Sequence, residues 1–347
     1  MTWKQDLTKR KHIADFHKAK KTQENLKDVF INGKNRGCPM PGSPCSFFRH
    51  TVKKSKRATF IFFIYNHQLK IYNELVMTDI LNDADFDRFR KVIYKECGIT
   101  FSGTNRPILD SRIKEILREK KIATVDEYYN LILSDREEMK RMLDSITTNL
   151  TRFFRNQPHF DAFINYVIPH VLEEKKKTGD RTIRVWSAGC STGEEPYTIA
   201  MILKKILPPG YSFSVTASDI SLKSLMVGQS GFYADNKIDG VPADYLSAFF
   251  TKVNGGYQIS KEIMEHVKFD YHNLQHESGM KNLDVVFCRN VMIYFDEAAQ
   301  LVVLNNFWNA MAQHSYLFIG HSESLFGMKT KFEFLKTDWA CLYQKNS

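Results

Sequence analysis

The sequence predicts an α/β protein: a doubly wound, Rossmann-like domain with a small antiparallel β insert, preceded by a small all-helical domain. Three observations lead to this prediction. Residues 79–166 carry apolar side chains at helical spacing, residues 184–219 hold two apolar segments around a glycine loop, and residues 250–259 contain a hairpin signal. The 347 residues, 43% of them hydrophobic, are enough for two cores.

Residues 1–76 differ in character from the rest of the chain. They hold 16 Lys and Arg against 5 Asp and Glu, a net charge of +11, so the formal +10 of the whole chain leaves −1 for the other 271 residues. We expect this extension to be disordered or to result from an upstream start, because Met77 begins a sequence typical of a natural start. A basic arm for a membrane or nucleic acid is the alternative. The near-neutral remainder argues against a nucleic-acid enzyme.

No segment is expected to enter a membrane. The apolar segment Thr59–Tyr65 is too short to span a bilayer, and it follows too many polar residues to be a signal peptide.

Residues 77–150 are expected to form the helical domain. Apolar residues recur three and four positions apart, as in Phe86, Phe89 and Ile93. A second helix is expected to begin near Pro107, with basic residues on and near one exposed side. This side is either a solvated helix face or a docking surface for an acidic partner.

Residues 151–347 are expected to form the doubly wound domain, and the junction before it has an unusual composition. Asn149, Thr151 and Arg155 are interleaved with Phe153 and Phe154, whose rings must be buried. Buried polar groups need partners, and an arginine is suited to a carboxylate. The junction is either part of a ligand site or a hinge that hydrogen-bonds itself.

A glycine loop follows the first expected strand, Arg184–Ala188. The small residues Gly189–Gly193 let the backbone approach a ligand, and a helix is expected near Pro196. Glu194 and Glu195 occupy the place where dinucleotide sites and P-loops bind phosphate, so a ligand with positive charge is favoured. The alternative is that both acids only complement the helix dipole.

Asp219 ends the next expected strand. An acid at this position holds a ribose diol in doubly wound folds. The glycine loop and Asp219 together therefore predict a nucleoside ligand with positive charge, such as S-adenosylmethionine.

An antiparallel β insert is expected at about residues 232–272. The turn Asn254–Gly256 is a hairpin signal, and the alternating segment Val267–Asn273 follows it. A third strand beside the hairpin would complete the insert.

The main sheet is expected to resume at the apolar strand Val285–Cys288. The end of this strand would bring Arg289, Asn290 and Tyr294 to the ligand edge of the sheet. The last two apolar segments predict a closing antiparallel hairpin.

The six cysteines contain no CxxC pair, which predicts a reducing compartment and no structural zinc or other metal. Cys190 and Cys288 fall near the expected site. They are interpreted as small buried filler, with a nucleophilic role as the alternative.

Together, five segments resemble the CheR family of bacterial chemotaxis receptor glutamate methyltransferases: TTNLTRFFRNQPHF, VWSAGCSTGEEPY, SDIS, FCRNVMIYFD and FIGHSES. The resemblance covers residue 79 to the end, and residues 1–76 have no counterpart in it. It implies methyl transfer from S-adenosylmethionine to glutamates on the cytoplasmic helical bundle of a chemoreceptor. The products would be a glutamyl methyl ester and S-adenosylhomocysteine.

The resemblance also implies roles for individual residues. Arg155 and Tyr294 would be catalytic, orienting a carboxylate that is already ionised, so no base is needed and His321 is expected to be structural. Arg112 and Arg118 would dock the receptor. Cofactor binding would fall to Asn149, Thr151, Arg155, Gly189, Glu195, Asp219, Asn273, Leu274, Arg289 and Asn290.

Some members of the family use the β insert to bind a receptor's C-terminal peptide by strand addition. The loop around Gly255 is where members differ, so the resemblance leaves this partner open.

Two other classes of function remain. A nucleic-acid methyltransferase would need an Asp/Asn-Pro-Pro-aromatic turn, which the sequence lacks, or a Pro-Cys nucleophile, and Pro44–Cys45 lies in the extension. A non-catalytic regulator that binds the cofactor is the other alternative.

Overall fold

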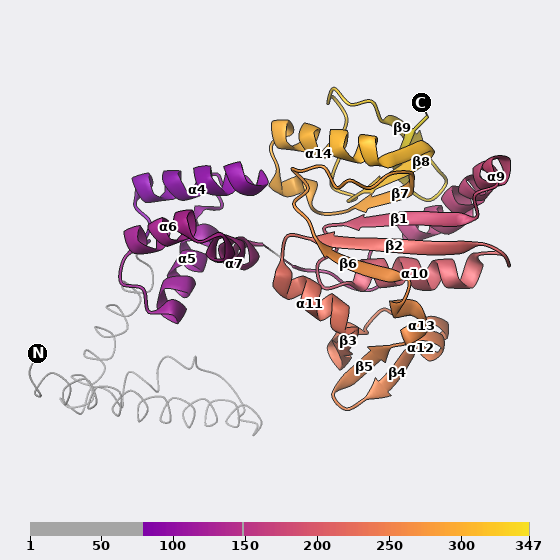
Figure 1. Ribbon diagram of the computed structural model, residues 1–347, viewed down its shortest axis with the longest axis horizontal. Coiled ribbons are helices and arrows are strands. Elements are labelled where there is room, and N and C mark those ends of the chain that lie inside the picture. The colour runs from indigo at the N-terminus through magenta and orange to yellow at the C-terminus, as the bar shows by residue number, and fades with distance from the viewer. Residues whose placement is uncertain (1–78, 148, 347) are drawn as a thin grey trace, which may run out of the picture. The chain divides into compact units, whose positions relative to one another are not determined.

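The computed structural model of the chain describes residues 79–147 and 149–346 (Figure 1). The expectations for residues 1–76 therefore lie outside the described residues. From Asp79 onward the chain forms one compact unit.

The first part of this unit is helical, as predicted. Its helices are α4 (Asp83–Cys97), α5 (Arg106–Lys120), α6 (Val125–Ser134) and α7 (Arg136–Ile146). Side chains cap the N-termini of α4, α6 and α7: Asn82 accepts from Asp85 N, Thr124 from Glu127 N, and Asp135 from Glu137 N and Glu138 N. Phe89, Ile113 and Tyr128 lie in a shared apolar core.

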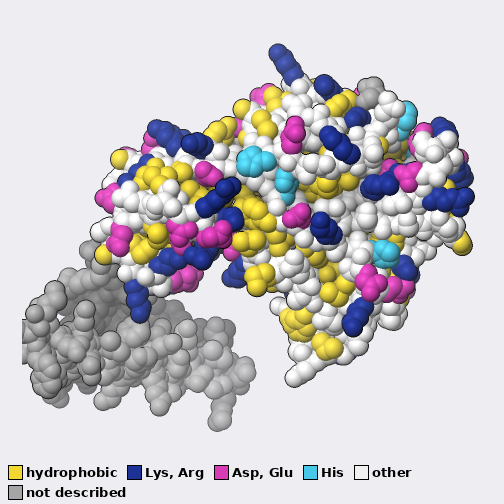
Figure 2. Space-filling view, viewed as in Figure 1, with side chains coloured by type: hydrophobic (Ala, Val, Ile, Leu, Met, Phe, Trp, Pro, Cys, Tyr) yellow, Lys and Arg dark blue, Asp and Glu magenta, His cyan; other side chains and the backbone are white. Residues whose placement is uncertain are grey.

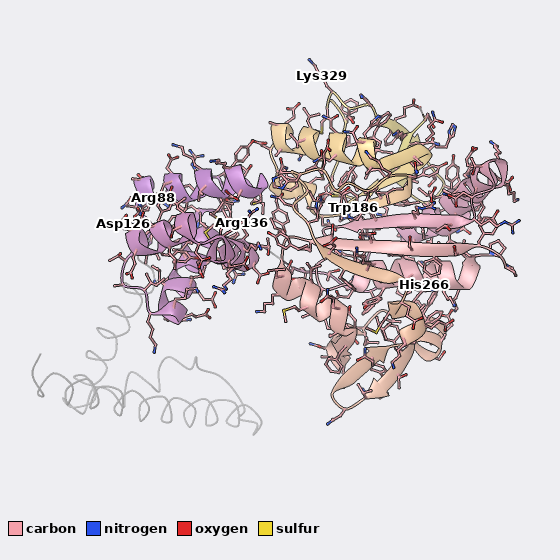
Figure 3. All side chains as sticks on the ribbon, in the orientation of Figure 1. Arg88, Asp126, Arg136, Trp186, His266 and Lys329 are labelled. Atoms are coloured by element: carbon pink, nitrogen blue, oxygen red, sulfur yellow. The ribbon has the colours of Figure 1, made fainter. Side chains whose placement is uncertain are left out.

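Charged side chains of both signs are intermingled on the face shown in Figure 2. Many form local pairs. Arg88 of α4, for example, lies 2.6 Å from Asp126 of α6 and stacks over Tyr129 (Figure 3). In the described part of the chain, the charges on this face therefore do not gather into one basic stripe.

The main sheet of the described residues has the strand order β6-β2-β1-β7-β8-β10-β9. The first five strands in this order, β6, β2, β1, β7 and β8, are parallel to one another. Strand β10 runs antiparallel to its neighbours β8 and β9. The strands are β1 (Thr182–Ala188), β2 (Ser212–Asp219), β6 (Val267–Tyr271), β7 (Leu283–Cys288), β8 (Met311–Ile319), β9 (Glu333–Lys336) and β10 (Cys341–Lys345). The closing antiparallel pair is confirmed, with β9 as an additional strand.

Helices cover both faces of this sheet because successive strand residues point to opposite sides. Val185 of β1 packs in the core on one face of the sheet, which helices before and after β1 cover. These are α8 (Gln157–Ala162), a π-helical turn (Phe163–Val167), α9 (Ile168–Thr178), α10 (Glu194–Ile206) and α11 (Leu222–Ser230). The next residue, Trp186, packs on the other face against Phe307 of α14 (Glu297–Ala310), 5.1 Å between ring centroids (Figure 3). The doubly wound prediction is confirmed.

The strand order reverses at β1. From β1 the chain adds β2 and β6 on one side and then returns to add β7 on the other. The loops after β1 and β7 therefore leave the same edge of the sheet in opposite directions, which opens a crevice at that edge.

The antiparallel insert is a separate sheet of order β3-β5-β4, within the described residues. It consists of β3 (Phe232–Ala234), β4 (Phe250–Val253) and β5 (Gly256–Ile259), with the predicted hairpin between the last two. A 3-10 turn (Asp235–Lys237) and helices α12 (Ala243–Phe249) and α13 (Lys261–Met264) accompany these strands.

The predicted end of the insert at residue 272 is wrong. Strand β6 belongs to the main sheet, where it pairs in parallel with β2 from Val215↔Val267 to Asp219↔Tyr271. Its alternating sequence has a simple cause, because β6 is an edge strand with one face covered and the other partly exposed. Alternation reports half-burial of a strand and says nothing of its partner's direction.

A search of the described helices finds none with the length and apolar character needed to cross a membrane.

Candidate active site

A cavity of about 290 Å³ lies at the carboxyl ends of β1, β2, β6 and β7. Its walls come from the loops after these strands, from the junction 149–155 and from the ends of α4, α5 and α7. It is lined by every residue expected to bind the cofactor or to act in catalysis: Asn149, Thr151, Arg155, Gly189, Glu195, Asp219, Asn273, Leu274, Arg289, Asn290 and Tyr294. The structure thus brings together side chains that are up to 145 positions apart in the sequence.

The glycine loop after β1 is held against β2. Gly189 N and Cys190 N both donate to Ser218 O, at 2.8 and 2.9 Å. Gly189 has φ 79°, and a Cβ there would lie 2.4 Å from a methyl group of Val291. Glycine is therefore required by both the backbone conformation and the close approach of the loop after β7.

Asp219 is a buried carboxylate at the base of the cavity. One of its oxygens accepts from Ser191 N and the other from Ser221 N, each at 2.8 Å. Burial raises the pKa of Asp219, and the two backbone N–H groups oppose that rise. Each oxygen keeps a lone pair, so the carboxylate can accept two further hydrogen bonds from a ligand.

Glu195 and Arg289 form an ion pair of 3.1 Å inside the cavity. Ser187 Oγ donates to the other oxygen of Glu195 at 2.7 Å. The Arg289 guanidinium also donates to Arg155 O at 2.5 Å and stacks over Phe160. Burial lowers the pKa of Arg289, and the Glu195 carboxylate opposes this effect. The pair joins the helix after β1 to the loop after β7 and to the junction.

Glu194 does not line the cavity, so only one of the two acids that favoured a positively charged ligand, Glu195, reaches it. The side chain of Glu194 is fully buried, accepts from Thr192 Oγ1 at 2.6 Å and lies 3.6 Å from Lys237 Nζ. Successive residues of a helix point about 100° apart, so adjacent acids at the start of α10 do not meet one ligand.

The junction adopts backbone conformations that only strong packing maintains. Phe154 and Asn156 have φ 51° and 68°, in the left-handed region. Phe153 packs against Tyr233 at 4.8 Å between ring centroids, and Phe154 N donates to Thr198 Oγ1 at 3.2 Å. The two rings are buried, as predicted.

The polar groups of the junction form hydrogen bonds within the protein and also line the cavity. Arg155 Nη1 donates to Leu150 O at 2.8 Å, and Asn149 Nδ2 lies 3.5 Å from Ser221 Oγ. The junction therefore satisfies part of its own hydrogen bonding, yet Asn149, Thr151 and Arg155 still line the cavity.

The loop after β7 is clamped by a carboxylate that sequence reasoning missed. Glu323 accepts from Asn290 N at 3.0 Å, from Ile293 N at 3.1 Å and from Gly320 N. Asn290 has φ 61°, and the 3-10 turn Met292–Tyr294 follows it. We name the contacts of Glu323 with these three N–H groups the Glu323 clamp.

Glu323 lies in the segment FIGHSES, where only His321 was singled out from the sequence. His321 is exposed and makes no hydrogen bond within the described residues. The structure therefore gives no support to the structural role expected for His321. The signal for Glu323 was weak, because its partners are backbone groups about 30 positions away.

The helical domain closes one side of the cavity. Thr100 N donates to Tyr294 O at 2.9 Å, and Ile99 and Phe295 form an antiparallel bridge. Asp144 of α7 accepts from Ser221 Oγ. The position of Tyr294 therefore depends on contacts from the helical domain.

The residues after β6 form another part of the wall, in contact with the helical domain. Asn273 Nδ2 donates to Glu96 O at 2.6 Å, while its oxygen accepts from Gln275 N at 3.1 Å. Leu274 is buried and supplies an apolar surface. Because β6 belongs to the main sheet, these residues reach the same edge as Asp219.

Cys190 and Cys288 are buried thiols without a disulfide. Burial raises the pKa of both well above the usual range. A protonated thiol is a poor nucleophile, so the burial of these cysteines favours a packing role over a nucleophilic one.

Arg112 and Arg118 lie on α5 and do not line the cavity. Arg112 is 3.4 Å from Glu115, whereas Arg118 is exposed and has no side-chain partner in the described part of the chain. Lys120 of the same helix pairs with the buried Glu138 at 2.7 Å. Some of the basic side chains of α5 are therefore paired with acids of the protein, and fewer of them are available to a partner than the sequence indicated.

Comparison with known proteins covers both parts of the described chain. Residues 149–341 match the family model described as CheR methyltransferase, SAM binding domain, and residues 84–147 match CheR methyltransferase, all-alpha domain. A chemotaxis protein methyltransferase of Borreliella burgdorferi is 33% identical over 270 residues, covering 76% of this chain and 94% of that protein.

Two further relatives agree with this result. The chemotaxis protein methyltransferase of Escherichia coli is 33% identical over 262 residues, covering 73% of this chain and 88% of that protein. A probable chemotaxis protein methyltransferase of Rhizobium etli is 32% identical over 245 residues, covering 68% of this chain and 91% of that protein.

Proposed function

We propose, because the chain belongs to the CheR methyltransferase family, that it transfers methyl groups from S-adenosylmethionine to glutamate side chains of chemoreceptors. Its membership makes it a methyltransferase of chemotaxis that uses S-adenosylmethionine. The proposal adds the glutamate acceptor and the glutamyl methyl ester product. The observation that carries it is the convergence of all the cofactor-binding and catalytic residues expected from the resemblance on one cavity.

The cavity fits the methyl donor chemically. S-adenosylmethionine combines a ribose diol, an adenine, an ammonium group and a methyl group on a positively charged sulfur. Asp219 is a buried carboxylate with free lone pairs for the ribose, and Leu274 offers an apolar surface beside Asn273 for the adenine. Glu195 supplies negative charge for the ammonium group, and Gly189 leaves room where a side chain would collide.

The acceptor needs orientation and no proton removal. A glutamate carboxylate has a pKa of about 4.3 and is ionised near neutral pH. Arg155 can hold such a carboxylate by charge-assisted hydrogen bonds, and Tyr294 lines the same cavity. The helical domain supplies part of the cavity wall, and exclusion of water by a bound acceptor would strengthen these contacts. The proposed catalytic work is therefore positioning.

A methylation assay tests the proposal. The full chain is incubated with S-adenosylmethionine carrying a radiolabelled methyl group and with membranes containing chemoreceptors, and the labelled receptor is then treated with base. We expect label on the receptor that base releases as methanol, because an ester hydrolyses. Label that resists base, or label on nucleic acid and none on receptor, would refute the glutamate acceptor.

Receptor docking is proposed for α5. Arg112 and Arg118 are on this helix, and the exposed guanidinium of Arg118 suits an acidic partner. This contact would lie outside the cavity, so it would affect receptor affinity and leave cofactor affinity unchanged.

A second contact is proposed for the β insert. In the described residues, β3 and β4 are the edge strands of the three-stranded sheet. An edge strand offers backbone groups to an added strand, which supports binding of a receptor's C-terminal peptide there.

We also propose that the protein acts in the cytoplasm, where the helical bundle of a receptor would be accessible to it. The described cysteines, Cys97, Cys190, Cys288 and Cys341, are all unpaired, as expected in a reducing compartment.

A further inference from the structure

A second hollow, of about 560 Å³, adjoins the cavity. It is lined by Leu150, Thr151, Arg152, Arg155, Asn156, Arg289, Asn290 and His321. Asn156 and His321 line this hollow and not the cavity, whereas the other six residues line both. We name the second hollow the vestibule.

The vestibule lies away from the nucleoside end of the cavity. Asp219, Asn273 and Leu274, the residues proposed for the ribose and adenine, line the cavity and not the vestibule. Arg155, the residue proposed to orient the reacting carboxylate, lines both. Thr151, Arg289 and Asn290, which are expected to bind the methyl donor, also line the vestibule. The vestibule therefore adjoins the reacting end of the site and lies away from the nucleoside end.

The vestibule carries positive charge that the protein does not neutralise. Its lining contains three arginines, Arg152, Arg155 and Arg289, and no Asp or Glu among the described residues. Arg289 is paired with Glu195, and Arg155 donates to a carbonyl. Arg152 is exposed and has no side-chain partner in the described ranges 79–147 and 149–346. An open hollow with an unpaired guanidinium favours an anionic occupant.

The walls of the vestibule are held in place. Two residues that line it, Asn156 and Asn290, have left-handed backbone conformations, with φ 68° and 61°. His321 follows Gly320, whose N–H donates to Glu323 and at which a Cβ would lie 2.6 Å from that carboxylate. The Glu323 clamp therefore sets the backbone position from which His321 extends.

We propose that the vestibule receives the acidic acceptor segment, and that Arg152 and His321 are specificity-determining residues for an acceptor that carries carboxylates. This inference rests on the proposed function and adds two residues to it. The positive charge of Arg152 and a hydrogen bond from the imidazole of His321 would favour ionised glutamate over glutamine at the entrance, and the charge would raise the local concentration of acidic segments. Arg155 would then orient the carboxylate that reacts.

The test measures methyl-transfer kinetics with a recombinant cytoplasmic fragment of a chemoreceptor as acceptor. The variants are Arg152→Ala, Arg152→Glu and His321→Ala, and Arg152→Lys retains the charge. Arg181→Ala is the matched control, because Arg181 is an exposed arginine directly before β1, at the opposite edge of the sheet. Binding of S-adenosylhomocysteine by calorimetry checks that each variant folds and keeps the cofactor site.

We expect the acceptor KM to rise about five- to tenfold in Arg152→Ala and further in Arg152→Glu, with kcat and cofactor affinity unchanged. His321→Ala should raise KM by a smaller factor, and Arg152→Lys should restore it. The decrease of kcat/KM with added salt should be less steep in Arg152→Ala, since one attractive charge is lost.

The failure of this inference is distinct from the failure of the proposed function. If the unaltered protein methylates the fragment and the variants keep its KM and salt dependence, the vestibule has no role in acceptor choice. A fall in kcat with unchanged KM would also overturn the inference. If the unaltered protein labels no receptor fragment, the proposed function itself fails.

Discussion

Arg155 joins the two hollows of the site, and its guanidinium is tied to the protein only through the carbonyl of Leu150 in the described residues. We predict that Arg155→Ala lowers kcat for receptor methylation about 100-fold or more, because the carboxylate loses its orienting contact. Arg155→Lys should recover part of the activity, since a lysine keeps the charge and loses the bidentate geometry. Radiolabel transfer under saturating cofactor measures this.

Arg181→Ala serves as the control for this prediction as well. Full activity of Arg155→Ala at saturating receptor would contradict the proposed role of Arg155. Cofactor binding by the variant, measured separately, shows whether the loss lies in binding or in transfer.

His159 is a buried imidazole whose charge state affects stability. Burial and the nearby charge of Arg289 hold the pKa of His159 at about 3. In the unfolded chain the imidazole titrates near 6.5, so between pH 6.5 and 3 the unfolded state binds more protons. The stability that neutral His159 provides is therefore complete above pH 6.5 and is lost as pH falls toward 3.

We predict that His159→Phe makes the free energy of unfolding less dependent on pH between about 6.5 and 4. The slope should decrease by up to about 1.4 kcal/mol per pH unit, the value for one proton. Denaturant titrations at several pH values measure it, with the exposed His276→Gln as control. Equal slopes in His159→Phe and the unaltered protein would contradict the low pKa.

At the scale of elements, the Glu323 clamp holds the loop that carries Asn290 and Tyr294. We predict that Glu323→Gln lowers kcat about tenfold and that Glu323→Ala lowers it further. Glutamine keeps one acceptor oxygen but turns an NH₂ group toward at least one of the three N–H groups, and alanine leaves all three without this acceptor. The affinity for S-adenosylhomocysteine should change less than kcat.

Steady-state kinetics and calorimetry separate these two effects for the Glu323 variants. Glu277→Ala, at an exposed glutamate outside the cavity, is the control. An equal loss of cofactor affinity and kcat would show that Glu323 supports the whole site and does not specifically position the loop.

Helix α5 provides a second prediction at this scale. The double variant Arg112→Ala/Arg118→Ala should raise the KM for receptor about fivefold or more, because α5 loses two positive charges that attract the acidic partner. Cofactor affinity should stay the same, since neither residue lines the cavity. Receptor titrations in the methylation assay measure KM. Arg90→Ala is the control in the same domain, at an exposed arginine paired with Asp87, and an equal effect there would contradict docking through α5.

The elements that the sequence predicted well depend on local chemistry. The hairpin at Asn254–Gly256 follows from the turn residues, and the strand Val285–Cys288 from its continuous apolar pattern. Strand β6 was assigned to the wrong sheet because alternation reports burial alone. The pair of adjacent acids, Glu194 and Glu195, does not by its pattern reveal which one the helix turns toward the cavity.

For the whole molecule, the sequence predicted which residues meet in the cavity but not how the helical domain closes it. The contacts of Asn273 with Glu96 and of Tyr294 with Thr100 join segments more than 170 positions apart. No local pattern marks such pairs, because they depend on the packing of complete domains. The carboxylate of Glu323 was missed for a related reason, because its partners are backbone N–H groups that no side-chain pattern marks.

One contact between the domains leads directly to the cofactor site. Asp144 of α7 accepts from Ser221 Oγ and from Lys223 N at 3.2 Å, while Ser221 N donates to Asp219. We predict that Asp144→Ala raises the Kd for S-adenosylmethionine about fivefold, because Ser221 and the ribose-binding carboxylate lose a support. Calorimetry measures the Kd.

Glu137→Ala is the control for Asp144→Ala, on the same helix and in an exposed pair with Lys140. An unchanged Kd in Asp144→Ala would mean that the helical domain closes the cavity without supporting Asp219. The receptor KM of both variants should equal that of the unaltered protein.

The left-handed residues Phe154, Asn156, Ser191 and Asn290 all belong to the segments around the two hollows. A phenylalanine in this conformation costs on the order of 1 kcal/mol, and the rest of the fold must offset that cost. Selection for heat resistance alone would therefore favour changes in these segments that relax the backbone. Such changes would loosen the site, so thermostability and turnover are opposed in this protein at the same few positions.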